Sequence, residues 1–248
     1  VQDDGTVILP NKNVKITKAA HIVLGYNWAF AKNFRLKSEI YFQYLFDVPV
    51  KENDTTGTVC ALNFGSGFTN ENFVNDGTWR NHGIEFTLEK FFSKNYYFLA
   101  TASVFESKYT MPDDIERNTL FNSKYIFNLV GGKEFVFKKN ILGLNTRLIW
   151  RGGYRTIPVD LDASIEKGYT VRIYDEAFET KAPDYFRLDA GISFRRNMPK
   201  WSWIVSINIQ NVTNRQNIWD EYYNPETQQM KQIFMVGLIP VLNYRIEF

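Results

Sequence analysis

The connections between the predicted strands alternate between short and long along the chain, and this ordering restricts the fold more than any other feature. Three of them are nearly the same short turn, at 31–33, 93–95 and 138–140, and a fourth at 196–200 is slightly longer. Each contains an Asn, which tolerates the left-handed backbone of a tight hairpin. A soluble sandwich has no reason to sort its loops by length, so the two ends of the sheet must meet different surroundings. The long polar connections lie at roughly 47–78, 109–119, 154–183 and 213–230.

The segments between the connections alternate apolar and polar residues with a period of two, which predicts strands with two unlike faces. In one segment Phe186, Leu188 and Ile192 form an apolar face. Arg187 and Asp189 fall on its polar face. No segment shows convincing helical periodicity. The pattern predicts about nine strands, near 20–30, 34–46, 79–91, 96–108, 120–135, 140–153, 184–196, 201–212 and 231–248.

The last predicted strand keeps this alternation up to Phe248, the final residue. Most soluble domains let their last residues fray into water, whereas a strand that is amphipathic to its end must be paired and half-buried there. In a bacterial outer-membrane barrel such a segment is the closing strand, and assembly machinery reads its terminal aromatic residue. We therefore interpret Tyr244, Ile246 and Phe248 as a barrel-assembly signal.

Composition is consistent with a barrel. No run of about 18 apolar residues is present, so the sequence predicts no transmembrane helix. This does not exclude a membrane, because barrel strands carry apolar residues only at every second position. Aromatic residues reach 17% and cluster beside the short turns, as in the aromatic girdle of a barrel. The fold class expected is an all-β, antiparallel up-and-down transmembrane β-barrel with short periplasmic turns and long extracellular loops.

Orientation follows from counting strands back from the end of the chain. If Phe248 lies at the periplasmic rim, every short turn is periplasmic, and residues 1–19 form an extracellular loop segment. Single-chain bacterial barrels have an even number of strands, so about nine strands with an external start indicate part of a larger barrel. We expect 20–248 to be its carboxy-terminal strands, without a plug domain. The net charge is +2 and blocks of basic residues are missing, so nothing indicates a nucleic-acid partner.

Several stretches of the chain resemble the TonB-dependent outer-membrane transporters, especially those of Bacteroidetes-type bacteria. The similar stretches are 81–90, 97–103, 182–189, 209–214 and 244–248. The resemblance implies a 22-stranded barrel, a plug inside it and TonB-driven uptake of siderophores, vitamin B12, glycans or peptides. The partners it implies are outer-membrane lipid, the missing amino-terminal strands and plug, the TonB complex reached through the missing amino terminus, the barrel assembly machinery and a surface lipoprotein.

Ligands of this family sit between the plug and the external loops or upper barrel wall, which directs attention to polar and aromatic residues near the long connections. Inward Arg side chains can hold carboxylate or iron-chelate ligands through forked hydrogen bonds. Alternatively, these residues belong to a polar, wet lumen wall that pairs with the plug or with neighbouring strands. The candidate ligand-binding residues are Trp79, Arg80, His82, Arg117, Arg151, Arg155 and Arg187.

The sequence does not indicate an enzyme, a cofactor or a metal site. His21 and His82 are the only histidines, and neither begins a metal-ligand spacing. No Ser is linked to either histidine by a sequence pattern, as a hydrolase would require. Cys60 is the only cysteine, so it forms no internal disulfide. Three alternatives stay open: a structural or adhesive barrel that binds a partner through its long loops, an outer-membrane hydrolase, and a soluble sandwich.

Overall fold

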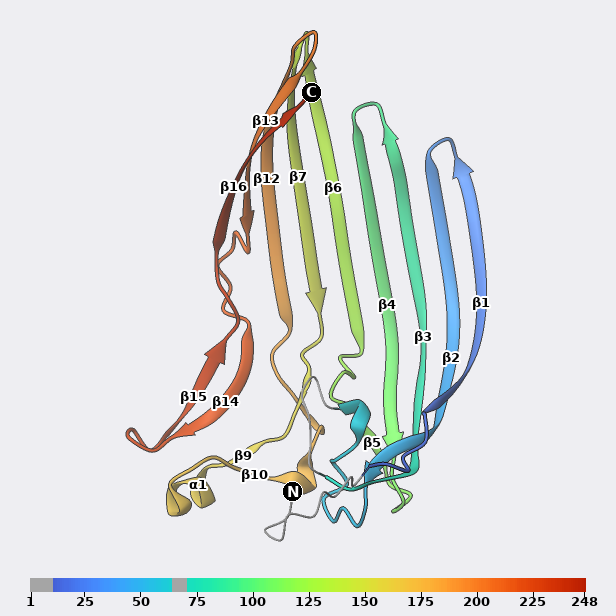
Figure 1. The fold of residues 1–248 in the computed structure, drawn as a ribbon, viewed down its shortest axis with the longest axis vertical. Helices are drawn as coiled ribbons and strands as arrows, with labels where there is room; N and C mark the ends of the chain where they lie inside the picture. Colours follow the sequence, from blue (N-terminus) through green and yellow to red (C-terminus); the bar gives the residue numbers. More distant parts are fainter. Residues whose placement is uncertain (1–10, 64–70) are drawn as a thin grey trace.

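A computed structural model describes residues 11–63 and 71–248. Nine long strands follow one another as a single antiparallel meander, each paired with the strand before it along the path (Figure 1). The path and the expected strand number are as the alternation predicted. In path order the strands are β1 (Lys18–Ala31), β2 (Phe34–Lys51), β3 (Phe73–Ser93), β4 (Tyr96–Thr110), β6 (Tyr125–Phe137), β7 (Asn140–Arg151), β12 (Tyr185–Asn197), β13 (Ser202–Gln210) and β16 (Ile239–Glu247).

The two ends of the sheet differ as expected. The short turns gather at one end, at the top of Figure 1, together with the carboxyl terminus. Asn33, Asn95 and Lys138 adopt positive φ angles of 68°, 62° and 54° in these turns, which is the backbone that the Asn-containing pattern predicted. The long connections all lie at the opposite end. We call these ends the short-turn end and the long-loop end.

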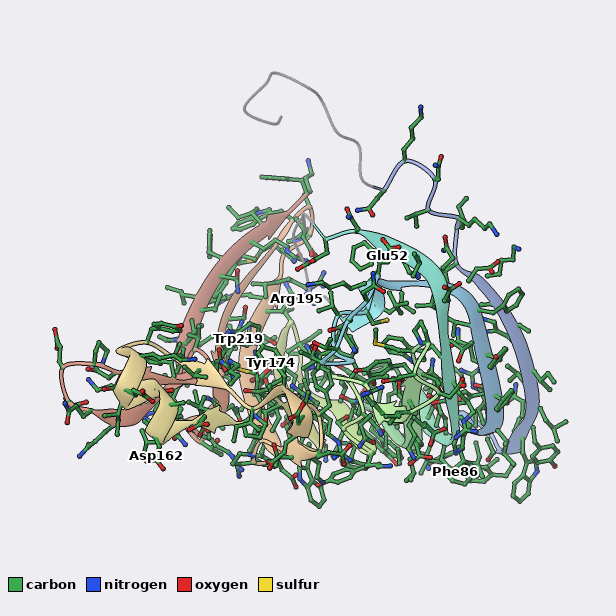
Figure 2. The ribbon with its side chains drawn as sticks, turned by 90° about the horizontal axis from the view of Figure 1, so that it is seen from below. Glu52, Phe86, Asp162, Tyr174, Arg195 and Trp219 are labelled. Atoms are coloured by element: carbon green, nitrogen blue, oxygen red, sulfur yellow. The ribbon has the colours of Figure 1, made fainter. Side chains whose placement is uncertain are left out.

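The sheet is curved, with one apolar and one polar face. Figure 2 shows it as a trough, with Phe86 on the convex side and Arg195 on the concave side. Residues paired across antiparallel strands share a face. Phe86 pairs with Ala102, which pairs with Phe127, and Trp150 pairs with Phe127 in turn, so an apolar row runs across the convex face. The odd-numbered polar residues of β12 therefore face the concave side.

The sheet is not closed within the described residues. Strands β1 and β16 stand at its two ends and each pairs on one side only. All 14 residues of β1 are exposed, on both faces, because no strand flanks its outer edge there. The described part of the chain is thus a curved wall with two open edges.

Three expectations about elements were wrong, two of them at the last strand and the 154–183 connection. The last strand begins at Ile239 rather than near 231, because β15 (Gln229–Phe234) pairs instead with β14 (Ile218–Asn224) in a separate hairpin. A helix, α1 (Leu161–Lys167), also forms where no helix was expected. The Asp160 side chain accepts a hydrogen bond from the Ala163 N–H at its start, and Gly168 ends it at a φ of 74°. No described helix is long and apolar enough to span a membrane.

The long connections carry their own short elements. The 154–183 connection folds back on itself, with β8 pairing with β11 and β9 with β10. The strand expected over 120–135 begins only at Tyr125, because the preceding residues form a buried turn. The short elements are η1 (Ala61–Asn63), β5 (Glu116–Asn118), β8 (Arg155–Thr156), β9 (Val159–Asp160), β10 (Val171–Arg172), η2 (Tyr174–Glu176) and β11 (Thr180–Lys181).

The apolar core of the described residues lies at the long-loop end, where the connections cover the concave side of the sheet. A single curved sheet has no second layer, so its middle buries little. Beyond Asp47, which has a φ of 55°, the register of β2 against β3 shifts and both strands continue into the loops. The core residues are Val48, Val50, Cys60, Trp79, Tyr109, Met111, Ala177 and Phe178.

The segment expected to be an extracellular loop, 1–19, lies partly outside the described residues, which begin at 11. Residues 11–17 run beside the start of β3 at the long-loop end. The Asn11 side chain accepts a hydrogen bond from the Phe73 N–H at 2.9 Å, and the Lys15 N–H donates to Asn75 Oδ1 at 2.7 Å. These bonds hold the segment to the sheet as far as β1.

Candidate functional site

Arg155 joins two of the long connections. Its backbone N–H donates to the carbonyl of Leu120 at 3.1 Å. Its guanidinium donates to the carbonyls of Asn122 at 3.3 Å and of Glu179 at 2.7 Å. The side chain is buried, and its charge is met by carbonyl dipoles from both connections. Arg155 was expected to bind a ligand; in the structure these hydrogen bonds are made within the fold.

The 52–63 connection is organised around Asp54. Its carboxylate accepts hydrogen bonds from the N–H groups of Thr56, Thr58 and Val59, at 2.8–2.9 Å. Partial burial alone would raise the pKa of this carboxyl, but the hydrogen bonds outweigh it and hold the pKa below its usual value. The charged form of Asp54 thus fixes the loop backbone.

The other end of this connection packs into the core. The Tyr109 hydroxyl donates to the Gly57 carbonyl at 2.8 Å. Burial raises the pKa of the Cys60 thiol to about 11. A buried, protonated thiol is a poor nucleophile, so Cys60 belongs to the core rather than to a reactive site.

Trp79 was another expected ligand residue, and it also lies in the core. Only 5% of it is exposed. Its indole N–H donates to Asn81 Oδ1 at 2.8 Å and to Ser107 Oγ at 3.0 Å, and its ring lies 6.0 Å from that of Tyr109. The side chain thereby anchors the loops to β3 and β4 near the long-loop end.

Two Arg residues that were candidates for ligand binding form ion pairs with neighbouring carboxylates. The Arg117 guanidinium donates hydrogen bonds to both carboxylate oxygens of Asp113, at 3.0 and 2.5 Å. The Arg187 guanidinium grips both oxygens of Asp189, at 2.7 and 2.9 Å. Forked pairs of this kind hold the guanidinium in place. Arg187 faces the concave side, next to the strand that carries Arg151.

Arg151 is free of such a partner. It pairs in register with Tyr185 on the concave face, and its guanidinium lies 5.0 Å from the centre of that ring. Among the described residues it forms no ion pair. Arg147 lies four residues earlier on the same face, opposite Asp189. We did not select Arg147 from the sequence, although counting by twos from Arg151 would have found it.

Arg80 and His82 do not join this group, because they lie on the convex face. They are separated from Phe86 by even numbers of residues, and in register Arg80 pairs with Tyr44 and His82 with Phe42. They belong to a row of charges near the long-loop end. The Arg80 guanidinium forms an ion pair with the Glu116 carboxylate there, and His82 Nε2 lies 3.8 Å from a Glu106 carboxylate oxygen. These two residues and Arg151 therefore lie on opposite faces of the sheet, and the role of the candidate residues as ligand contacts stays a prediction.

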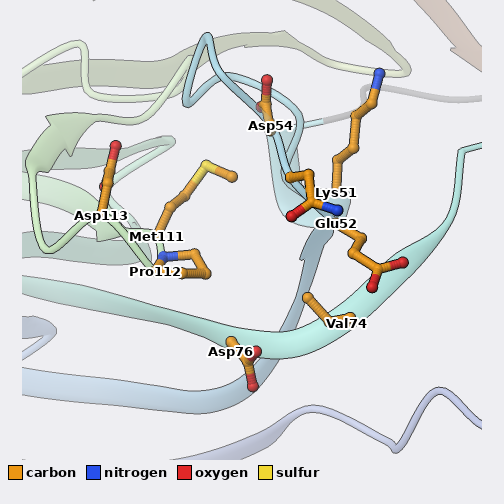
Figure 3. Close-up of a pocket in the computed structure, with 9 residues that line it drawn as sticks. Lys51, Glu52, Asp54, Val74, Asp76, Met111, Pro112 and Asp113 are labelled. Atoms are coloured by element: carbon orange, nitrogen blue, oxygen red, sulfur yellow. The ribbon is translucent and has the colours of Figure 1, made fainter.

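Cavities lie between the long connections. One of about 310 Å³ is rimmed by carboxylates, among them Asp54, Asp76 and Asp113 (Figure 3). Asp54 and Asp113 are already engaged, with loop N–H groups and with Arg117. In the described ranges no cluster of His, Cys, Asp or Glu is arranged to hold a metal ion.

Two further cavities adjoin each other between the 154–183 connection and the β14–β15 hairpin. They measure about 390 and 370 Å³. Arg172 and Asp220 line both, and their ion pair, with N–O distances of 3.0 and 3.1 Å, stands in the shared wall. The Tyr154 hydroxyl, which also lines both, donates to the carbonyl of Trp219. The sequence predicted only long polar connections here, because these contacts join residues far apart in the chain.

The chain was compared with known proteins. A family model described as TonB-dependent receptor-like, β-barrel, matches residues 1–212. No curated protein matches. Among solved structures, the ferric yersiniabactin uptake receptor FyuA from Yersinia pestis is similar at 14% identity and a TM-score of 0.61, over 94% of this chain and 30% of that one.

Two more solved structures are similar. The ferric preacinetobactin receptor BauA from Acinetobacter baumannii has 13% identity and a TM-score of 0.61, over 94% of this chain and 29% of its own. The FrpB iron transporter from Neisseria meningitidis has 14% identity and a TM-score of 0.56, over 95% and 32%. At such identities the likeness concerns the fold, and the chain spans about 30% of the length of these proteins.

Proposed function

The chain belongs to the TonB-dependent receptor-like β-barrel family of the bacterial outer membrane, and from this premise we propose that it is part of an active transporter that imports a large or scarce solute with TonB-supplied energy. The observation that carries the proposal is the division of the sheet into an apolar convex face and a polar concave face. In a barrel these are the lipid-facing and lumen-facing sides. The family consists of transport receptors rather than enzymes.

The orientation we propose places the long-loop end outside the cell and the short-turn end in the periplasm. Outer-membrane barrels have long external loops and short periplasmic turns, and the structure separates its connections in this way (Figure 1). Tyr244 and Ile246 then lie on the lipid-facing side close to the periplasmic rim, paired through β16 with β13. This is the position from which we propose that the assembly machinery reads them, together with Phe248.

The open edges of β1 and β16 require partners. An unpaired strand edge in the hydrocarbon layer leaves N–H and C=O groups without water or protein. We propose that further strands of the same receptor close the barrel between these edges and that a plug fills the concave side. The TonB complex and a surface lipoprotein are partners of the whole receptor in this proposal.

The concave wall near the long-loop end is the proposed ligand-facing surface. Arg151 is its best candidate contact, since its guanidinium lies over an aromatic ring and is free of a carboxylate. The similar receptors named above carry ferric chelates or iron, by their descriptions. Because that likeness extends only to the fold, we keep four solute classes in the proposal: siderophores, vitamin B12, glycans and peptides.

Growth of a deletion strain tests this function. The gene for the whole receptor is deleted in its host, and growth is measured with ferric siderophores, vitamin B12, glycans or peptides as the limiting nutrient. We expect loss of growth on one class and the same loss when TonB is deleted. Complementation of the deletion strain with the wild-type gene, or with the Arg80→Ala variant on the convex face, should restore growth. Arg151→Ala should lower uptake about tenfold, because a charge-assisted hydrogen bond contributes about 1.5–3 kcal/mol. Unchanged growth on all four classes would instead favour a structural or adhesive barrel.

A further inference from the structure

The larger of the two adjoining cavities, about 390 Å³ in volume, has the size of a small-molecule site. Each of the four long connections contributes residues to its wall. The 52–63 connection supplies Thr58 and Asn63, the next supplies Leu120, and the hairpin supplies Asp220. The 154–183 connection supplies most of the remainder, including Arg172 and an aromatic side.

The Asn63 side chain carries a buried polar atom that lacks a hydrogen-bond partner in the described part of the chain. Asn63 is 91% buried, since 9% of it is exposed, and its Oδ1 accepts a hydrogen bond from the Leu120 N–H at 3.2 Å. Its amide nitrogen, Nδ2, is buried and has no hydrogen-bond partner among the residues that the structure describes. Buried polar groups are almost always paired, so an orphaned donor indicates a missing acceptor. A molecule bound in the cavity would supply that acceptor.

The charges of the wall favour an anion. Arg155 and Arg172 bring two guanidinium groups, whereas Asp220 is the one carboxylate in the wall. That carboxylate is already held by Arg172, which also donates to the Ile157 carbonyl at 2.9 Å. The formal charges of the wall thus leave one positive charge in excess, which attracts an anion.

The rest of the wall suits an apolar body attached to that anion. Tyr154, Tyr174 and Phe178 line it, with Ile157 and Leu120. Flat aromatic and aliphatic surfaces bind rings and hydrocarbon by burial, while a few polar groups fix orientation. An anion with an aromatic body would satisfy both halves of the cavity.

We propose that this cavity binds the carboxylate group of an aromatic acid, free or as part of the imported solute. The carboxylate accepts from Asn63 Nδ2 and faces the excess charge of the guanidinium groups, and the ring lies against the tyrosines. Asp220 keeps Arg172 oriented. The inference rests on the proposed uptake function, because it defines the solute that the external loops select.

Binding of a fluorinated acid to the purified whole receptor tests the proposal. The probe is 4-fluorobenzoate, followed by fluorine NMR in detergent, and 4-fluorobenzamide is its uncharged counterpart. We expect the acid to bind at least about tenfold more tightly than the amide, in line with the strength of a charge-assisted hydrogen bond. Equal binding of the two probes, or binding of neither, would overturn the proposal.

Two variants of the 52–63 connection show whether the preference for the acid arises in this cavity. Asn63→Asp keeps the oxygen that accepts from Leu120 but replaces the free donor with a negative charge, so it should abolish the preference for the acid. Asn53→Asp makes the same charge change in the same connection, at an exposed residue outside this cavity, and should leave the preference intact. Heat-modifiable gel mobility checks that both variants are folded. A retained preference in the folded Asn63→Asp variant would contradict the proposal.

The growth experiment separates this inference from the function on which it rests. Uptake of a solute by wild type without any preference for the acid refutes the cavity proposal and leaves transport standing. Preference for the acid without growth dependence on any solute class refutes transport and leaves the binding site standing.

Discussion

Gly57 shows how a single residue fixes the position of a loop. Its φ is +66°, and a Cβ built there would lie 2.6 Å from Arg117 Nε. Any side chain would therefore meet both backbone strain and the guanidinium that holds Asp113. Glycine here lets the 52–63 connection lie directly on β5.

We expect Gly57→Ala to destabilise the long-loop end by roughly 1–3 kcal/mol for the strained backbone position, plus the cost of displacing the Arg117 guanidinium. Gly168→Ala is the matched control, since Gly168 has a similar φ of +74° but open space around its Cβ position. The measurement is thermal unfolding of the whole receptor in detergent, combined with protease cleavage within 52–63. Equal effects of the two variants would show that the contact with Arg117 is unimportant.

The candidate residues show what single positions reveal in sequence. Arg151 was selected because polar residues alternate along its strand. The structure places it on the concave face, and its role as a ligand contact stays a prediction. Arg155 looked the same in sequence, yet its guanidinium donates to the carbonyl of Asn122 in another connection and of Glu179 in its own. Asn63 gave no signal, because its burial and its contact with Leu120 join residues far apart in the chain. Residue roles that depend on contacts distant in the chain cannot be read from local pattern.

At the scale of elements, the 52–63 connection should respond to pH through Asp54. Its pKa is lower in the folded state than the ordinary value of 3.8. The carboxylate therefore stabilises the loop fully above about pH 4, and this contribution is lost as pH falls through the lower folded value. We expect protease cleavage within the loop to increase below pH 4, measured with an acid-active protease.

Asp54→Asn provides the control for this pH response. The amide cannot accept all the N–H groups that the carboxylate accepts, so the loop should be cleaved readily at neutral pH and change little on acidification. A wild-type loop that is equally protected at pH 7 and pH 2.5 would contradict the role given to Asp54.

The long strands could be predicted and the small elements could not, for a physical reason. Each long strand separates two different environments, so its alternation appears in its own residues, as in β12. The hairpin β14–β15 and helix α1 lie wholly at the long-loop end, and neither separates an apolar from a polar side over its length. Their pairing and caps, such as Asp160 before α1, depend on short-range hydrogen bonds that many loop sequences allow.

At the scale of the whole molecule, the described wall has an apolar outside, a polar inside and a single core under its long loops. The middle of the sheet is one layer thick, so its stability in isolation is limited by the two open edges. The membrane and the remaining strands of the receptor supply, in our proposal, what the chain does not bury by itself. The loops, by contrast, are held by buried hydrogen bonds such as those of Arg155.

The most direct test of the central claim places an arginine on either face of one strand in the whole receptor. Ile207 faces the convex side, opposite Ile192, and the neighbouring Ser206 faces the concave side, opposite Ser193. A lipid-facing arginine near mid-membrane costs about 2–4 kcal/mol, whereas a lumen position tolerates charge. In heat-modifiable gel assays, Ile207→Arg should strongly reduce the folded, fast-migrating form, and Ser206→Arg should leave it nearly unchanged. Equal folded fractions for the two variants, or a greater loss with Ser206→Arg, would contradict the claim that the convex face meets lipid.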